Sequence, residues 1–228
     1  MNFFKNGYEI FENFIDPNRL DIFSDSLYNK EVVCYANQNF FKLKDPYVQC
    51  PEIIDLCLTT EVQKLVRLLL GNHWAIGGCN LRRNLVTNNA ENTVTFFHRD
   101  HNSNNFIKLF FYLNDVTMEG GPFTYVEGSH IDRREAGWTD GSRWTDEQIT
   151  GLYGQDKIKH LTANKGDLIV ANTTGFHKGL KCKAKERLML TINFTTEQER
   201  YGKFKLSKNT LDKLSEDDKF RCRFMEIV

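Results

Sequence analysis

Residues 107–130 read IKLFFYLNDVTMEGGPFTYVEGSH, a stretch typical of two β-strands joined by a turn. Its two runs, 107–116 and 122–130, are rich in residues that favour strands, and Asn, Asp and Gly interrupt them. Further short runs of the same texture lie at 73–86, 93–101, 157–163, 167–180 and 186–194. This succession of short strands predicts a β-sandwich or β-barrel core.

Helices are expected mainly before the strands. Residues 16–29 are typical of a helix that Asp16 caps. A second helix is expected to begin at Thr60, where Thr60 and Gln63 match a capping box, and to end at Gly71. A brief helix is expected near residues 145–148, and short outer helices after residue 197. The fold class is therefore α+β or mainly β, with the N-terminal helices packed on one sheet.

Composition places the chain among ordinary globular proteins. It has 228 residues, of which 40% are hydrophobic and 26% charged, and no linker divides it, so we expect one domain over residues 1–228. Its 30 basic and 30 acidic residues balance, so nothing predicts a nucleic-acid partner. No run resembles a membrane span or an export signal, and the six cysteines form no CxxC motif. We therefore expect a cytoplasmic protein with free thiols.

The stretch FFHRDH at 96–101 is an apolar run that ends in ionisable residues. Its continuation, HRDHNSNN, fits the catalytic-loop pattern of protein kinases. That reading fails because the chain lacks the Gly-rich loop, the strand lysine and the Asp-Phe-Gly motif that kinases also need.

A metal site explains the stretch better. On an extended strand His98 and Asp100 share a face, and Arg99 points away. His177 follows another apolar run that ends in a polar turn, so it is the best candidate for a third ligand. Two histidines and one carboxylate form the facial triad of non-haem Fe(II) oxygenases. The remaining histidines are expected to be exposed or hydrogen-bonded.

Arg187 follows His177 by ten residues, in a run that alternates as a strand next to the His177 strand would. A guanidinium can hold a carboxylate in a bidentate fork. A 2-oxo acid that chelates iron could therefore place its far carboxylate on Arg187.

Four blocks of the chain resemble, in order, the phytanoyl-CoA dioxygenase family of Fe(II)/2-oxoglutarate-dependent oxygenases. They are FHRDH, KLFFYLNDVTMEGGPFTYVEGSH, KGDLIVANTTGFHKGL and Arg187, and the resemblance covers about residues 73–195. It implies a double-stranded β-helix, or jelly roll, with helices on one sheet. It also implies a single dioxygenase domain that uses Fe(II), 2-oxoglutarate and O2.

By motif match, the resemblance implies that His98, Asp100 and His177 bind iron and that Arg187 anchors 2-oxoglutarate. Halogenating relatives carry a small residue in place of the carboxylate, so Asp100 favours hydroxylation with release of succinate and CO2. Met189 stands where some oxygenases have serine, and Thr191 on the same strand face is the substitute candidate. Lys108 and Tyr112 share a strand face and are further candidates for cosubstrate binding.

The substrate is expected to be a small or carrier-linked organic molecule. The long polar segment 131–156 resembles a lid or recognition element, and its Arg133, Arg134 and Arg143 are candidates for contacting an anionic group. On the strand at 73–86 only one of the adjacent Arg82 and Arg83 faces inward. Two alternatives stay open: an inactive jelly-roll binding protein, and a cupin-like isomerase or hydrolase with another metal. The oligomeric state is left open.

Overall fold

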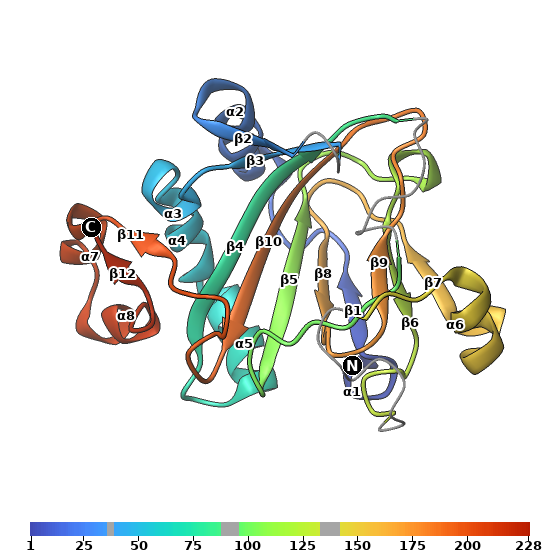
Figure 1. Ribbon diagram of the computed structural model, residues 1–228. Helices are drawn as coiled ribbons and strands as arrows, with labels where there is room; N and C mark the ends of the chain where they lie inside the picture. Colours follow the sequence, from blue (N-terminus) through green and yellow to red (C-terminus); the bar gives the residue numbers. More distant parts are fainter. Residues whose placement is uncertain (36–38, 88–95, 133–141) are drawn as a thin grey trace.

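A computed structural model describes residues 1–35, 39–87, 96–132 and 142–228 and shows two antiparallel sheets that face each other (Figure 1). Within these residues the larger sheet has seven strands in the order β1-β8-β5-β10-β4-β3-β2, and the smaller has three in the order β7-β6-β9. The larger sheet comprises Tyr8–Phe11 (β1), Val32–Tyr35 (β2), Phe40–Leu43 (β3), Ala75–Asn84 (β4), Phe106–Tyr112 (β5), Leu168–Ala171 (β8) and Arg187–Thr195 (β10). The smaller comprises Phe123–Val126 (β6), Ile158–Leu161 (β7) and His177–Gly179 (β9). The expected jelly-roll core is confirmed.

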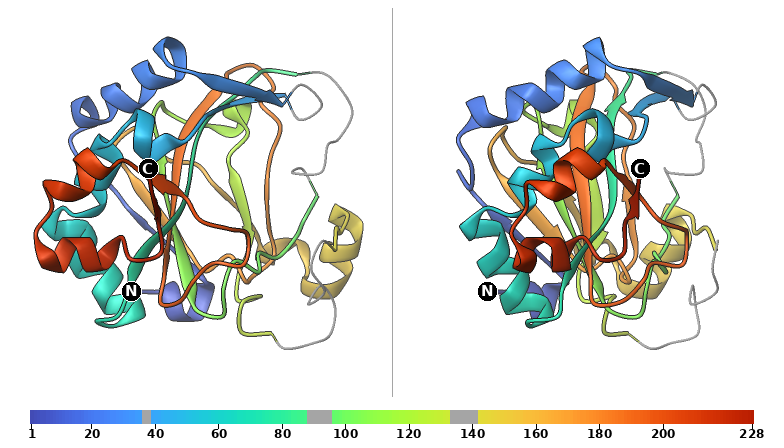
Figure 2. Two further views of the ribbon diagram at one scale, coloured as in Figure 1. Left: turned by 60° about the vertical axis from the view of Figure 1, so that its left-hand side comes forward. Right: turned by 90° about the vertical axis from the view of Figure 1, so that its left-hand side faces the viewer.

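Helices cover the outer face of the larger sheet. Figure 2 shows this layer together with a C-terminal unit that holds the short parallel pair β11 and β12. The layer and the C-terminal unit comprise Asp21–Asn29 (α2), Pro46–Gln49 (α3), Glu52–Cys57 (α4), Thr60–Leu70 (α5), Lys205–Leu206 (β11), Lys208–Asp212 (α7), Glu216–Arg221 (α8) and Glu226–Ile227 (β12). The other helical segments are Phe3–Asn6 (α1), Pro17–Leu20 (η1), Met118–Gly120 (η4), Asp146–Tyr153 (α6) and Gln155–Lys157 (η5). In the described part of the chain no helix is long and apolar enough to cross a membrane.

Strand β10 shows how the two layers are built. All nine of its residues are buried, so both faces of the strand are covered. Leu190 and Ile192 pack in the core with the helices, whereas Met189 packs between the sheets with Phe123 and Tyr125. The alternation of side chains therefore directs Thr191, on the same face as Met189, into the space between the sheets.

The expected N-terminal helices are present, but one predicted cap is wrong. Asp16 accepts a hydrogen bond from Asn18 N at 3.0 Å, and a 3₁₀ turn precedes α2. α5 ends at Gly71 as predicted, with φ at +77°. Its capping residue, however, is Thr59, and no side chain caps the helix. Gln63 instead donates to the carbonyl of Leu58, at the end of α4, because the two helices follow each other directly.

Several strands differ from the sequence-based expectation. β1, β2 and β3 are four-residue strands that extend the two sides of the large sheet, in a region for which only helices were predicted. Conversely, the described part of the run 93–101 forms only isolated bridges, Phe97 with Trp144 and His98 with His177. The brief helix near residue 145 is α6, where Thr145 and Gln148 form a capping box.

Gly121 lies in the turn between β5 and β6 and provides a test of this fold. Its φ is +67°, and a Cβ there would lie 2.4 Å from the backbone oxygen of Lys181. Gly121→Ala should destabilise the fold by about 1–3 kcal/mol from the backbone conformation alone, with a further cost for the clash. Gly120→Ala is the matched control, because its Cβ would meet only Val116, at an ordinary 3.5 Å. Urea unfolding of both variants measures the difference, and equal stabilities would contradict this turn geometry.

Candidate metal centre and its cavity

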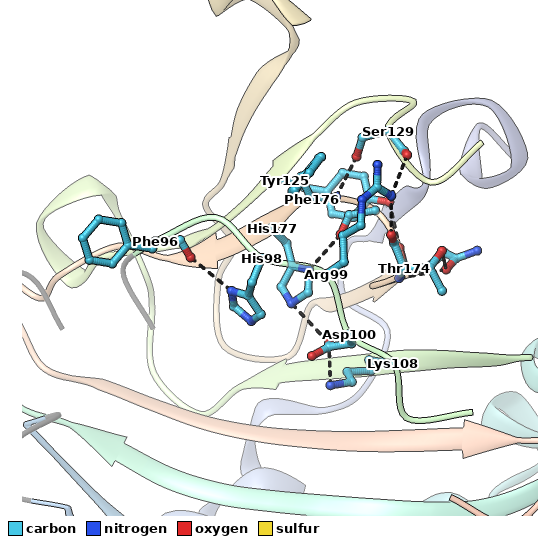
Figure 3. Close-up of polar contacts among 12 residues, drawn as sticks. Phe96, His98, Arg99, Asp100, Lys108, Tyr125, Ser129, Thr174, Phe176 and His177 are labelled. Atoms are coloured by element: carbon cyan, nitrogen blue, oxygen red, sulfur yellow. Dashed lines mark hydrogen bonds and ion pairs between the residues drawn. The ribbon is translucent and has the colours of Figure 1, made fainter. Parts of the chain in front are cut away.

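His98, Asp100 and His177 come together between the two sheets (Figure 3), and one potential ligand atom from each lies within 4.8 Å of the others. Backbone hydrogen bonds join the two segments that carry these residues. His98 N donates to His177 O, and His177 N donates to His98 O, both at 3.0 Å. Asp100 N donates to Thr173 O at 2.8 Å. The predicted convergence of these three residues is therefore present.

Both imidazoles are oriented in the same way. Nδ1 of His98 lies 3.1 Å from the carbonyl oxygen of Phe96, and Nδ1 of His177 lies 2.9 Å from that of Gly175. When Nδ1 carries the proton and donates it to a carbonyl, Nε2 presents its lone pair to a metal. Burial, and then the nearby His177, lower the pKa of His98 to about 3. His98 is therefore the neutral form that a metal ion requires.

Asp100 is a largely buried carboxylate, with its side chain 18% exposed, next to positive and polar groups. Its Oδ2 lies 2.7 Å from Nζ of Lys108 and 3.2 Å from Nε2 of His177 (Figure 3). Burial alone would raise the pKa of Asp100, but the Lys108 ammonium and the two imidazoles more than offset it and hold that pKa well below its usual range. Asp100 is therefore charged at neutral pH and can serve as an anionic ligand.

Arg99 points away from the other two residues of its motif, as predicted. It is 4% exposed, and its Nη1 donates to the carbonyls of Ser129 (3.0 Å) and Thr174 (Figure 3). Its guanidinium lies 4.1 Å from the ring centre of Phe176, the residue before His177. Arg99 thus ties the loop that holds two potential ligands to the segments around the third.

A cavity of about 180 Å³ adjoins the three residues. The cavity wall is mainly polar and carries three cationic side chains. It is formed by Asn80, Arg82, His98, Asp100, Lys108, Phe110, Phe123, His177, Lys178, Gly179 and Thr191.

The candidate cosubstrate residues differ in their access to this cavity. Lys108 and Thr191 line it. Tyr112 does not, and its hydroxyl already accepts from Phe123 N at 2.8 Å and donates to Leu161 O at 3.1 Å. Arg187 is 3% exposed and also lies outside the lining residues. Its strand β10 lies between β5 and β4 in the large sheet, whereas β9 pairs with β6 in the small one, so the prediction that Arg187 lies on a strand next to the His177 strand is wrong.

Arg82 was not singled out as a site residue, yet it lines the cavity. Arg83 points the other way, where Nε lies 2.7 Å from Glu186. The alternation of a strand implied that only one of the two faces inward, but the sequence does not say which one. Asn80, two residues before Arg82 on the same face, is a second lining residue that sequence reasoning missed.

His130, His160 and Arg143 are not among the described residues that line this cavity. His130 and His160 are hydrogen-bonded as expected, to the carbonyl of Phe4 (3.1 Å) and to Thr124 (2.9 Å). Arg143 is exposed. Arg133 and Arg134, named as candidates for an anionic group, lie outside the described residues.

Arg99→Met tests the positioning role of this arginine. Each carbonyl left without its donor should cost about 1–3 kcal/mol of unfolding free energy. The variant should also bind Ni(II) more weakly, because Arg99 holds the loop between His98 and Asp100. Chemical denaturation and metal titration measure the two effects. Arg143→Met, at an exposed site, should change stability by less than about 0.5 kcal/mol; equal behaviour of the two variants would contradict the role.

Comparison with known proteins places the chain in a family. The phytanoyl-CoA dioxygenase (PhyH) family model matches residues 3–185. HygX from Streptomyces hygroscopicus, solved with nickel and 2-oxoglutarate bound, is 15% identical, with a TM-score of 0.66 over 91% of this chain and 88% of HygX. SnoN, a non-heme alpha-ketoglutarate-dependent epimerase from nogalamycin biosynthesis, is 15% identical, with a TM-score of 0.69 over 87% of this chain and 82% of SnoN.

The carbocyclase SnoK from the same biosynthesis is 14% identical, with a TM-score of 0.64 over 86% of this chain and 82% of SnoK. At such identities these likenesses show a shared fold. None of the curated proteins compared with the sequence matches it. The family model, however, spans most of the sequence, and the chain belongs to the phytanoyl-CoA dioxygenase family.

Proposed function

We propose that the protein is a non-haem Fe(II)/2-oxoglutarate-dependent oxygenase that hydroxylates a small organic molecule. The observation that supports the proposal most directly is the meeting of two imidazoles and a charged carboxylate at a cavity that an arginine also lines. Family membership and a fold shared with 2-oxoglutarate-dependent enzymes support it.

The donor set fits Fe(II). Two imidazole nitrogens and one carboxylate oxygen form the 2-His-1-carboxylate triad, which leaves coordination positions free for other ligands. The hydrogen bonds from both Nδ1 atoms to backbone carbonyls fix the rings for metal binding through Nε2. His98, Asp100 and His177 would therefore hold the ion.

The cavity fits 2-oxoglutarate, which carries a carboxylate at each end. Together, iron and 2-oxoglutarate supply the oxidising power, and the protein binds, orients and shields them. Arg187 is proposed to hold the far carboxylate, with the Thr191 hydroxyl as a donor to it. Lys108, beside Asp100, is proposed to contact the end of the cosubstrate nearer the metal. Tyr112 has no such role in this proposal, because its hydroxyl is already engaged.

A second cavity, of about 410 Å³, shares Asp100 with the first and suits the organic substrate. Its wall is polar and includes His101, Asn105, Asn172 and Arg200. These groups favour a small substrate with hydrogen-bonding groups, and Arg200 would suit an anionic one. HygX has also been solved with hygromycin B bound, so a small-molecule substrate is in keeping with this fold.

Hydroxylation is favoured because Asp100 is retained and leaves no vacant place for a halide. SnoN and SnoK are an epimerase and a carbocyclase, so the product has to be identified directly. A protein that only binds its ligand, or a cupin-like isomerase or hydrolase, would not convert 2-oxoglutarate to succinate.

Removing one ligand should abolish specific metal binding. With Ni(II) at about 100 times its dissociation constant, binding adds about 2.7 kcal/mol to the stability of the wild-type protein. His177→Ala should lose this stabilisation. His160→Ala should keep it, because His160 lies outside the triad and bonds to Thr124. Thermal unfolding with and without Ni(II) checks this, and an unchanged metal response of His177→Ala would argue against the site.

Aerobic incubation with Fe(II), ascorbate and 2-oxoglutarate should release succinate from the wild-type protein. Asp100→Ala should reduce the rate at least about 100-fold, because the carboxylate of the triad is lost and an uncompensated Lys108 remains beside the metal position. Succinate is quantified by mass spectrometry, with His160→Ala as the active control. Wild-type protein that releases no succinate with any substrate offered would refute the proposed function.

A further inference from the structure

Arg82 and Arg187 lie close together on one face of the large sheet. In the pairing of β4 with β10, Arg82 is opposite Met189 and Arg187 is opposite Asn84. Residues two positions apart across such a pair are diagonal neighbours, within reach of long side chains. Met189 packs between the two sheets, so both arginines belong to the inward face of their strands.

Neither guanidinium forms an ion pair with a carboxylate of the described residues. Nε of Arg82 and Nε of Arg187 are buried without a hydrogen-bond partner, and the bond from Arg187 to Leu180 O is long, at 3.4 Å. Arg83, on the opposite face, is bound to Glu186 at 2.7 Å. The Arg82 guanidinium also lies 5.7 Å from the ring centre of Phe40. A buried N–H group without an acceptor is costly, so the two unpartnered Nε atoms favour a bound anion.

The charges around the cavity point to where that anion binds. Lys108 is paired with Asp100, and Lys178 with Asp146. Arg82 is the third cationic side chain in the cavity wall, and it forms no ion pair with a carboxylate of the described residues. Burial, and then the charge of Arg187, lower the pKa of Arg82 to about 10, so the two guanidiniums repel each other. A carboxylate between them would relieve that repulsion.

We propose that Arg82 is a second anchor for the far carboxylate of 2-oxoglutarate, which is held between guanidiniums from the adjacent strands β4 and β10. This inference rests on the proposed function. Arg82 lines the cavity and Arg187 does not, so Arg82 is the guanidinium that an entering carboxylate can contact directly. Two cations at this end of the site select dicarboxylic over monocarboxylic 2-oxo acids.

The test compares two ligands of equal chain length. Calorimetric titration of the Ni(II)-loaded protein uses 2-oxoglutarate and 2-oxopentanoate, which keeps the metal-chelating end but lacks the far carboxylate. Arg82→Met should weaken 2-oxoglutarate binding about 10- to 100-fold, the worth of a charge-assisted hydrogen bond. Its affinity for 2-oxopentanoate should change by less than about 2-fold. Arg83→Met is the matched control and should leave both affinities unchanged.

Arg82→Lys keeps the charge but not the bidentate fork, so it should lose part of the 2-oxoglutarate affinity and none of the 2-oxopentanoate affinity. It also replaces Arg82→Met if that variant does not fold. Unchanged 2-oxoglutarate binding in Arg82→Met and Arg82→Lys, or an equal loss for both acids, would overturn the inference while leaving the proposed function intact. A wild-type protein that does not bind 2-oxoglutarate would overturn both.

Discussion

The site depends on one backbone interaction, the reciprocal pair of hydrogen bonds between His98 and His177. It joins a loop that enters from the large sheet to the first residue of β9 in the small sheet. Paired backbones fix the distance between two Cα atoms more tightly than side-chain contacts do. The imidazole rings of the two residues consequently lie with their centres 4.3 Å apart. Asp100 is held near the two imidazoles by its own backbone hydrogen bond to Thr173. The hydrogen bond from the Arg99 side chain to the carbonyl of Thr174 holds the same loop in place.

The second constraint is the burial of both faces of β10. One face joins the apolar core under the helices, and the other faces the small sheet. A strand buried on both sides is usually apolar throughout, yet this one carries Arg187, Thr191 and Asn193. Buried polar groups need partners, so the inward face must be satisfied by other side chains or by a ligand. Asn193, for example, donates to Glu199 at 2.7 Å. Arg187 has no such partner among the described carboxylates, and for this reason it is proposed to bind a ligand.

The sequence predicts features that depend on neighbouring residues, but not those that depend on contacts between distant elements. The alternation of β-forming residues and the spacing of His98 and Asp100 are local patterns, and they led to the sheets and to two of the three potential ligands. His177 was found because it follows an apolar run.

The predicted capping box at Thr60 is absent, because Thr59 and Gln63 instead hydrogen-bond to the end of the preceding helix. The sequence also could not show that the Tyr112 hydroxyl is hydrogen-bonded to Phe123 and Leu161, because these contacts join different strands. The direction of Arg82 required knowledge of which face of β4 turns inward.

Charge links the two binding events proposed for the cavity. Among the described residues of the cavity wall, Asp100 is the one anionic side chain. Lys178 is paired with Asp146, so Asp100 faces Arg82 and Lys108, and an Fe(II) ion would add two further positive charges. Asp100 cannot neutralise both Lys108 and the metal. A ligand with two carboxylates supplies the missing negative charge at both ends of the cavity at once. Under the proposed function, metal and 2-oxoglutarate therefore bind with positive coupling, and thermodynamic linkage requires each to raise the affinity of the other by the same factor.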